Sequence, residues 1–328
     1  MTRPLRVVVS RRIFPALVNE LRSEFDLVAN QDDVAWSASE LAAALRDADG
    51  ALLTAGDRID ETLLAHCPRL KAVANIAVGI NNLDLAACTR HGVLATNTPE
   101  VLNEATADHA WALLLAAARR VGESERWLRA GLWKRWTFEM FMGAAVSGTT
   151  LGILGMGRIG RAIARRAAGF SMPVIYHNRT RLPADLEGGA RFVPLPELLR
   201  ESDHLVLVVP YSAEVHHLID AAALAQMKPT VVLVNIARGG VIDDRALVAA
   251  LRNGHIAAAG LDVFENEPAL HPGLLELENV VLTPHIASST RATRMAMAQL
   301  AVTNLRAALA GQVPPSLVNP AVLENRRR

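Results

Sequence analysis

The sequence predicts an α/β protein built from two doubly wound parallel-sheet units in tandem. In the first hundred residues, short β-like runs alternate with helical patterns such as SASELAAALRDA, and a second alternating set starts near Thr150. A glycine-rich turn, GMGRIG at 155–160, stands between an apolar run and an Ala/Arg-rich helical pattern. Because alternating strands and helices are typical of parallel βαβ units, these three observations indicate the same fold class.

The expected elements follow in chain order. The β-like runs of the first unit are Arg6–Ser10, Ala51–Thr54, Ala72–Ile76 and Val93–Thr96. Those of the second unit are Leu151–Leu154, Val174–His177, Leu205–Val209, Val231–Asn235, Ala257–Asp262 and Val280–Leu282. One long helical segment is expected from about Asn103 to Ala130, and an amphipathic helix after His285 that ends at Gly311. The final residues, ENRRR, are expected to form a frayed tail.

Composition limits the kind of protein. A chain of 328 residues, 51% hydrophobic, can bury two ordinary cores, which favours two domains. A net charge of +1 argues against a nucleic-acid partner. No run reaches the ~18 apolar residues that span a bilayer, and Cys67 and Cys88 form no CxxC pair. We therefore expect a soluble, cytoplasmic protein with no membrane association.

The glycine turn predicts a dinucleotide site. In such a site the first glycine (Gly155) makes the tight turn, the second (Gly157) lets backbone approach a pyrophosphate, and the third (Gly160) lets helix and strand pack closely. Arg158 and Ile159, which open the helix, are assigned to the same site because a helix N-terminus offers free N–H groups to phosphate. The alternative is a packing turn with no ligand.

The choice of nucleotide depends on the end of the second strand of this unit, about twenty residues on, where an acid would bind a ribose 2′-hydroxyl. Here the chain reads VIYHNRTRLP, so that Asn178 stands at the acid position and Arg179, Thr180 and Arg181 follow. A carboxylate would repel a 2′-phosphate, whereas an amide with adjacent guanidinium and hydroxyl groups can bind one. The sequence predicts NADP(H) rather than NAD(H), unless these arginines are merely solvated.

Ionisable residues follow three consecutive predicted strands. Arg238 follows TVVLVNIA, Glu267 stands five residues beyond Asp262, and His285 follows VVLTP. Ligands of doubly wound sheets bind outside the carboxyl ends of the strands, so we expect these three side chains to converge there. Taken singly, each has an ordinary alternative: a helix cap, a turn acid and a hydrogen-bonding histidine.

An arginine, a carboxylate and a histidine together suit the reduction of a 2-oxo acid. A protonated His285 can give a proton to the carbonyl oxygen as hydride reaches the carbon, and Glu267 can favour the charged ring and orient it. Arg238 can bind the substrate carboxylate through its planar fork. The other histidines, including the adjacent His216 and His217, show no metal-ligand spacing, so no metal site is expected.

At these residues the chain resembles the D-isomer-specific 2-hydroxyacid dehydrogenases, and most closely the branch of NADPH-dependent glyoxylate/hydroxypyruvate reductases that includes 2-ketogluconate reductases. The resemblance rests on GILGMGRIG, VNIARGGVIDDRALVAAL, AAGLDVFENEP and VVLTPHIASST, in that order. It implies that Arg238 orients the substrate, Glu267 is the acid partner and His285 is the proton donor. It also implies the substrates glyoxylate, hydroxypyruvate and 2-ketogluconate. Some members of the family are corepressors, so a non-catalytic, nucleotide-sensing binding protein stays open as an alternative.

The resemblance implies further site residues and an arrangement of domains. Substrate contacts are implied for the backbone N–H groups of Val78 and Gly79, in NIAVGINNLDL, and Ser288 is assigned to the same site. Further cofactor contacts are implied for Thr106, Pro210, Ile236, Ala237 and Asp262, of which Thr106 and Asp262 lie near the nicotinamide and Pro210 near the adenosine. A Rossmann domain, 101–285, is expected to be inserted into a flavodoxin-like substrate domain, 1–100 and 286–328. The resemblance also implies a homodimer. The apolar side chains of Trp133, Trp136, Phe138, Phe141 and Met142 suit its interface, and the alternative for each is a place in the intrachain core.

Overall fold

The computed structural model describes residues 3–327 and divides the chain into two compact units. One unit comprises the chain up to Leu102 and from Thr290 onward, and the other comprises Asn103–Ser289. These boundaries lie a few residues beyond those expected from the sequence. As a consequence, the turn that follows His285 belongs to the second unit together with His285 itself.

The first unit is built on a 5-stranded parallel sheet with the order β2-β1-β3-β4-β5. Its elements are β1 (Arg6–Val9), α1 (Pro15–Glu24), β2 (Asp26–Ala29), α2 (Ala38–Leu45), β3 (Gly50–Leu53), α3 (Glu61–Ala65), β4 (Ala72–Asn75), α4 (Leu85–Arg90), β5 (Leu94–Thr96), α13 (Arg291–Leu309) and the 3₁₀-helix η4 (Pro320–Glu324). This order is the flavodoxin-like one. The strand β2 was not expected from the sequence, because this short edge strand begins with an exposed Asp26 and has no fully buried residue.

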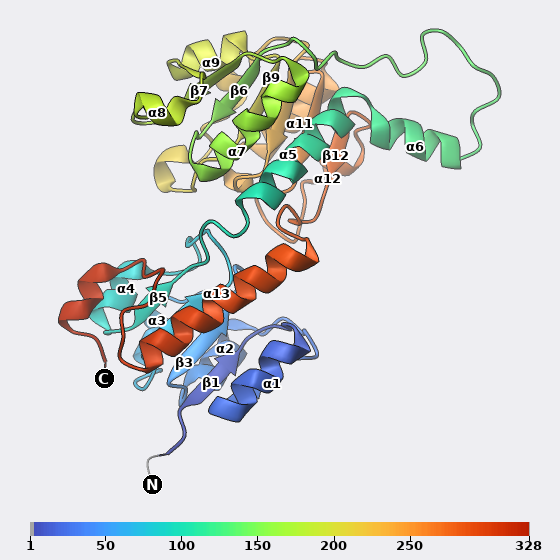
Figure 1. The fold of residues 1–328 in the computed structure, drawn as a ribbon. Coiled ribbons are helices and arrows are strands. Elements are labelled where there is room, and N and C mark those ends of the chain that lie inside the picture. Colours follow the sequence, from blue (N-terminus) through green and yellow to red (C-terminus); the bar gives the residue numbers. More distant parts are fainter. Residues whose placement is uncertain (1–2, 328) are drawn as a thin grey trace. The chain divides into compact units, whose positions relative to one another are not determined.

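The C-terminal helix α13 returns to the first sheet (Figure 1). A Cβ on Gly50, at the start of β3, would lie 2.8 Å from Leu305 Cδ1, so a larger residue there would require the leucine side chain to shift. The buried Asn304 donates its side-chain N–H to Asn97 O at 3.2 Å and accepts from Ser316 N at 3.0 Å. These contacts join the two distant parts of the chain into one unit.

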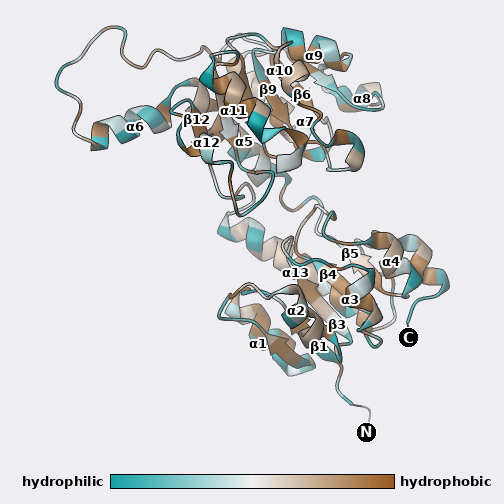
Figure 2. Ribbon diagram, turned by 180° about the vertical axis from the view of Figure 1, so that it is seen from behind, coloured by the Kyte–Doolittle hydropathy of each residue, from teal (hydrophilic) through white to brown (hydrophobic). Residues whose placement is uncertain are grey.

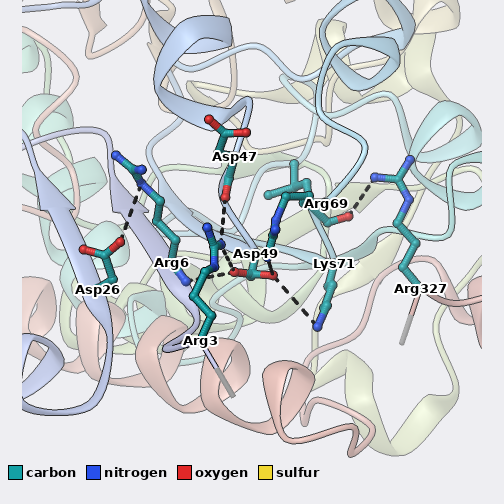
Figure 3. Close-up of polar contacts among 9 residues, drawn as sticks. Arg3, Arg6, Asp26, Asp47, Asp49, Arg69, Lys71 and Arg327 are labelled. Carbon is teal, nitrogen blue, oxygen red and sulfur yellow. Dashed lines mark hydrogen bonds and ion pairs between the residues drawn. The ribbon is translucent and has the colours of Figure 1, made fainter. Parts of the chain in front are cut away.

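A cluster of cations surrounds Asp49 at the amino ends of the strands, as Figure 3 shows. The buried Asp49 carboxylate accepts from Arg6 N at 2.9 Å and pairs with Arg3 at 3.1 Å, Arg69 at 3.2 Å and Lys71 at 3.9 Å. Burial alone would raise the pKa of Asp49, but the N–H of Arg6 and the guanidinium groups of Arg69 and Arg3 outweigh it and lower that pKa. The cluster therefore fixes the N-terminal segment to the edge of the sheet opposite the strand-end turns.

The C-terminal segment is anchored rather than frayed, so that prediction is wrong for the described part of the tail. The Arg327 guanidinium donates to Cys67 O at 2.7 Å and to Leu70 O at 3.0 Å, and its backbone N–H donates to Gly92 O at 2.9 Å. Figure 3 shows one of these guanidinium contacts. A run of arginines predicts a solvated tail. The sequence does not reveal the three carbonyl acceptors, because only the fold brings them close to Arg327. Arg328 lies outside the described residues.

The second unit is built on a 7-stranded parallel sheet with the order β12-β11-β10-β9-β6-β7-β8. Its elements are α5 (Asn103–Ala118), α6 (Val121–Arg129), β6 (Leu151–Leu154), α7 (Arg158–Ala167), η1 (Ala168–Phe170), β7 (Val174–His177), α8 (Ala184–Glu187), β8 (Arg191–Phe192), α9 (Leu195–Glu201), β9 (His204–Leu207), η2 (Ala213–Val215), α10 (Ala221–Leu224), β10 (Val232–Asn235), η3 (Gly239–Val241), α11 (Asp244–Arg252), β11 (Ala258–Leu261), α12 (Pro272–Leu275) and β12 (Val280–Leu282). Six of these strands follow the Rossmann order, and β12 extends it. The strand β8 was not expected from the sequence, because it has only 2 residues.

Both faces of the second sheet are covered, as continuous apolar strands require. Along β10, Leu233 packs into one core, whereas Val232 and Val234 pack into the other, together with α5 and α7. On that second face, Trp111 of α5 donates its indole N–H to Ile163 O at 3.1 Å. The Rossmann unit is therefore a three-layer α/β/α structure whose strand ends lie at its edges.

The expected long helix from Asn103 to Ala130 is broken at Arg120, which adopts a left-handed conformation with φ of 54°. A later segment of the chain explains the break. Ala144 N donates to Ala118 O at 2.8 Å, so this carbonyl at the end of α5 has a partner outside the helix. A Cβ on Gly143 would lie 2.2 Å from the same carbonyl oxygen. This tertiary contact cannot be read from the local sequence pattern.

The segment after α6 extends away from the rest of its unit, as Figures 1 and 2 show from opposite sides. Its large apolar side chains are exposed: Leu132, Trp133, Trp136, Phe138 and Met142. Phe141 is half-buried, makes an edge contact with Trp127 and receives the Arg120 guanidinium over its ring. Within residues 3–327, no helix combines the length and apolarity needed to cross a membrane.

Candidate active site

Arg238, Glu267 and His285 all follow neighbouring strands of the second sheet. Arg238 follows β10, Glu267 lies in the turn after β11, and His285 lies in the turn after β12. Because β10, β11 and β12 are adjacent and parallel, these turns emerge at one edge of the sheet. The structure therefore places the three side chains on turns that share one edge.

His285 and Glu267 form a direct pair. The distance from His285 Nδ1 to Glu267 Oε2 is 2.8 Å, and the other carboxylate oxygen accepts from Phe264 N at 2.9 Å. Burial alone would raise the pKa of Glu267, but the hydrogen bonds from His285 and Phe264 and the charges of His285 and Arg238 outweigh it and lower that pKa. Glu267 therefore stays charged, fixes the ring through Nδ1 and leaves Nε2 as the nitrogen for proton transfer.

The Arg238 side chain lies in a desolvated position within electrostatic range of Glu267. Burial lowers the pKa of Arg238, and the Glu267 carboxylate acts in the opposite direction. A guanidinium remains charged in a protein even so. Arg238 therefore offers a positive charge and a planar fork beside the His285–Glu267 pair.

Two features fix the turn that carries Arg238. The buried Asn235 accepts from Ala237 N at 3.0 Å and donates to Arg238 O at 3.1 Å. A Cβ on Gly239 would lie 1.8 Å from Phe264 C, so only glycine allows this turn to pack on the turn that leads to Glu267. Asn235 and Gly239 are therefore positioning residues, and the sequence reasoning missed both.

Asp262 fixes the turn that carries His285. Its carboxylate, 1% exposed, accepts from Ile286 N and Ala287 N at 2.8 Å each and from Thr283 Oγ1 at 2.7 Å. Burial alone would raise the pKa of Asp262, but these hydrogen bonds and one from His109 outweigh it and lower that pKa.

The same turn holds His285 in an uncommon conformation. Its φ is 53°, in the left-handed region that non-glycine residues rarely adopt, and its N–H donates to Asp262 O at 2.9 Å and to Thr283 O at 3.0 Å. The contacts of Asp262 hold the turn, with Ser288 three residues beyond His285. Asp262 therefore acts on the turn through its carboxylate, a role that the sequence analysis did not foresee.

The glycine turn has the geometry of a phosphate cradle. Gly155 has φ of 105° and a Cβ there would lie 2.9 Å from Val208 C, whereas a Cβ on Gly160 would lie 2.3 Å from Gly155 O. At Gly157 a Cβ would meet nothing within 4 Å, and no side chain caps the start of α7. An open backbone at an uncapped helix N-terminus fits the pyrophosphate of a dinucleotide. Arg158 and Ile159 form the first turn of that helix.

Residues 178–181 divide into groups with different partners. Asn178 Oδ1 accepts from Met156 N at 2.6 Å and so braces the glycine turn. Arg179, with a side chain that is 83% exposed, pairs with Glu214 at 3.3 Å, and Thr180 is exposed beside it.

Arg181 is instead engaged by Glu187. Its guanidinium donates to the Glu187 carboxylate at 2.8 and 3.1 Å, and the buried Tyr176 hydroxyl donates to that carboxylate at 2.7 Å. These bonds lower the pKa of Glu187 to about 2. The network holds the loop in place at Arg181, so Arg179 and Thr180 are the exposed side chains at the tip of the loop.

The other predicted contacts are distributed over both units. Thr106 is buried on α5, Pro210 follows β9, and Ile236 and Ala237 are buried in the turn after β10.

Val78 and Gly79 lie in the first unit, in the turn after β4. There the carbonyl of Val78 accepts from the Asn97 side chain at 2.8 Å and that of Gly79 from the Asn75 side chain at 2.9 Å. Side-chain amides therefore set the course of this turn.

A family model described as the NAD binding domain of D-isomer specific 2-hydroxyacid dehydrogenases matches residues 111–287. The chain belongs to this family. The matched region covers the glycine turn. It also covers Arg238, Glu267 and His285, which we call the strand-end trio. This 2-hydroxyacid dehydrogenase is therefore an oxidoreductase that acts with a nicotinamide cofactor.

Full-length relatives agree with the family assignment. The dehydrogenase is 50% identical to the glyoxylate reductase of Thermococcus onnurineus, with 98% of each chain covered, and 46% identical to that of Pyrococcus furiosus, with 98% of this chain and 97% of the relative covered. Among solved structures, a putative 2-hydroxyacid dehydrogenase from Polaromonas has a TM-score of 0.90 at 40% identity, covering 97% of this chain and 100% of the other.

An NADPH-dependent glyoxylate/hydroxypyruvate reductase from Sinorhizobium meliloti, solved with NADP and malonate, has a TM-score of 0.88 at 37% identity. The match covers 100% of this chain and 99% of that one. Both parts of the two-unit fold are therefore shared with solved members of the family.

Proposed function

We propose that this dehydrogenase reduces small 2-oxo acids, foremost glyoxylate and hydroxypyruvate, to D-2-hydroxy acids with NADPH. The observation that carries the proposal is the 2.8 Å pair of His285 and Glu267 next to the charge of Arg238, on adjacent strand ends. The names of the relatives from Thermococcus onnurineus and Sinorhizobium meliloti support the same substrates.

Each residue of the trio has a part in the reaction. A bound nicotinamide cofactor supplies the hydride for the carbonyl carbon. Arg238 binds the carboxylate of the 2-oxo acid and polarises its carbonyl, which orients the carbon. As the C–H bond forms, the carbonyl oxygen gains negative charge and takes the proton from His285 Nε2, which leaves a neutral imidazole. Glu267 remains a carboxylate and holds the ring throughout.

The direct test is turnover by the pure protein. Incubation with NADPH and glyoxylate or hydroxypyruvate should consume the cofactor, followed by its absorbance, and should yield glycolate or D-glycerate. A panel that extends to 2-ketogluconate then defines the substrate range. Tight NADPH binding without turnover of any 2-oxo acid would contradict the proposal and favour a non-catalytic, nucleotide-sensing protein.

The preference for NADPH rests on the loop after β7. Asn178 is neutral and turned toward Met156 N, so no carboxylate stands there to bind a 2′-hydroxyl or to repel a 2′-phosphate. Arg179 and Thr180 are exposed at the loop tip, whereas Arg181 is engaged by Glu187. We therefore assign the 2′-phosphate to Arg179 and Thr180, and the support of the loop to Arg181.

The substitution Arg179→Ala should raise the KM for NADPH about tenfold or more and leave the KM for NADH within about twofold. A charge-assisted hydrogen bond to phosphate is worth roughly 1.5–3 kcal/mol, and NADH has no phosphate at this position. Arg252→Ala, which breaks a similar surface pair with Glu276, is the matched control for the lost charge. Equal weakening of both cofactors by the Arg179 variant would refute the assignment.

A homodimer completes the proposal. The exposed Trp133, Trp136, Phe138 and Met142 lie on one extended segment, and aromatic residues of this kind are enriched at the centre of protein interfaces. A segment that projects from its own unit cannot bury these side chains against it. A second copy of the chain would cover them.

A further inference from the structure

His216, His217 and Glu265 form a second cluster of ionisable side chains. The two histidines follow η2, and Glu265 lies in the turn after β11. Their ligand atoms all lie within 4.8 Å of one another, with His217 Nε2 at 2.6 Å from Glu265 Oε1 and the two rings stacked at 3.9 Å. None of the three belongs to the strand-end trio. Sequence reasoning missed the cluster because Glu265 is 48 residues from its partner His217.

We propose that these three side chains form a binding site for a divalent transition-metal ion of the Zn²⁺ type, with water at the remaining position. Two imidazoles and one carboxylate are a common set of protein ligands for Zn²⁺. Tetrahedral bonds of about 2.0–2.1 Å place neighbouring ligand atoms roughly 3.3 Å apart. The atoms already lie within 4.8 Å, so small side-chain rotations are enough to reach that spacing.

The surroundings hold the ligands in place. The distance from Tyr211 Oη to His216 Nδ1 is 3.0 Å, so the Tyr211 oxygen can accept a hydrogen bond from Nδ1–H, which leaves Nε2 as the ligand atom. His217 N donates to Gly240 O at 2.8 Å, and Glu265 N donates to the buried Asp244 carboxylate at 3.2 Å. These bonds fix the backbone on both sides of the cluster.

Glycine at position 240 is part of the same arrangement. A Cβ there would lie 3.0 Å from the Tyr211 ring and 3.3 Å from His216 Nδ1. The small residue thus lets Tyr211 reach His216 over the turn. The side chains are accessible to an ion from solvent, because His216 is exposed and the side chains of His217 and Glu265 are 34% and 27% exposed.

The test measures metal binding directly on the full chain, free of any polyhistidine tag and treated with a chelator. Titration calorimetry with Zn²⁺ should show one equivalent bound, and Co²⁺ should give the visible absorption bands of a tetrahedral site with nitrogen ligands. His216→Gln and Glu265→Gln should each weaken Zn²⁺ binding about 10²-fold. Tyr211→Phe should weaken it about tenfold, because second-shell partners of a ligating histidine typically contribute this much.

His255→Gln is the control, because His255 is an exposed histidine outside the cluster. Circular dichroism of each variant verifies the fold, and the exposed His216 is the position least expected to disturb it. If the wild-type chain binds no stoichiometric Zn²⁺, or if the His216 and Glu265 variants bind as the wild type does, the three residues are only a hydrogen-bonded pair with a stacked ring. Failure here leaves the proposed reductase function untouched, since no trio residue is changed.

Discussion

Replacing His285 by glutamine should lower kcat for 2-oxo acid reduction by about 10²-fold or more. Glutamine can still donate a hydrogen bond to Glu267, which His285 contacts at 2.8 Å, but it has no proton to give to the carbonyl oxygen. Steady-state rates with NADPH and glyoxylate measure the effect. The Kd for NADPH, measured by fluorescence, should stay within about twofold because the glycine turn is unchanged. A loss of only a few-fold in kcat would remove His285 as the proton donor.

The pH profile distinguishes the loss of a proton donor from a structural disruption of the site. Reduction needs a protonated ring, so kcat/KM should fall toward alkaline pH, while oxidation of the hydroxy acid rises. Since the pKa of Glu267 is lowered, the carboxylate stays charged from the usual carboxyl range upward and provides the His285 ring with an anionic support. In Glu267→Gln that support is gone, so the alkaline loss of reduction should move to lower pH. An alkaline limb at the same pH in this variant would show that the carboxylate only orients the ring.

The sequence is sufficient to predict those parts of the site that lie directly after strands. A parallel sheet brings consecutive strand ends to one edge, so finding Arg238, Glu267 and His285 after their strands was enough to expect that they share that edge. The glycine turn follows for a related reason, because the backbone of Gly155 and Gly160 tolerates no side chain. Here local residue type and topology determine the geometry together.

Contacts between distant segments account for what the sequence did not reveal. The break at Arg120 depends on a hydrogen bond from Ala144, and the anchoring of Arg327 depends on carbonyls of the first unit. The buried Asn235 carried a visible signal, as a polar residue that closes an apolar strand. That signal does not reveal that its amide clamps the turn of Arg238.

The loop after β7 shows that charge alone does not identify which arginine can bind a phosphate. Arg179 and Arg181 look equivalent in the sequence as candidates for a phosphate. In the structure, Arg181 faces Glu187, whose carboxylate is also held by Tyr176, whereas the pair of Arg179 with Glu214 is exposed on both sides. Exposed pairs contribute little, so a phosphate can displace Glu214 from Arg179 far more easily than Glu187 from Arg181.

The substitution Arg238→Lys should lower kcat/KM for the 2-oxo acid by about 10²-fold or more, although the charge is kept. An ammonium cannot reproduce the two parallel hydrogen bonds of a guanidinium to a carboxylate, and a charge-assisted bond is worth roughly 1.5–3 kcal/mol. Burial adds to the loss, because it penalises the charged form of a lysine much more readily than that of an arginine. Arg245→Lys, on the exposed start of α11, should leave the kinetics unchanged.

The split between kcat and KM then decides what Arg238 does. The hydrogen bond from Asn235 and the packing of Gly239 against Phe264 fix the backbone at position 238. A lysine there would have the same backbone position and would differ only in the length and shape of its side chain. A residue that binds the carboxylate alone should raise KM and leave kcat unchanged. We expect both to change, because misorientation of the carbonyl carbon by a fraction of an ångström lowers the rate as well as the affinity. A variant with kcat equal to that of the wild type would show that Arg238 binds the substrate without orienting the reacting carbon.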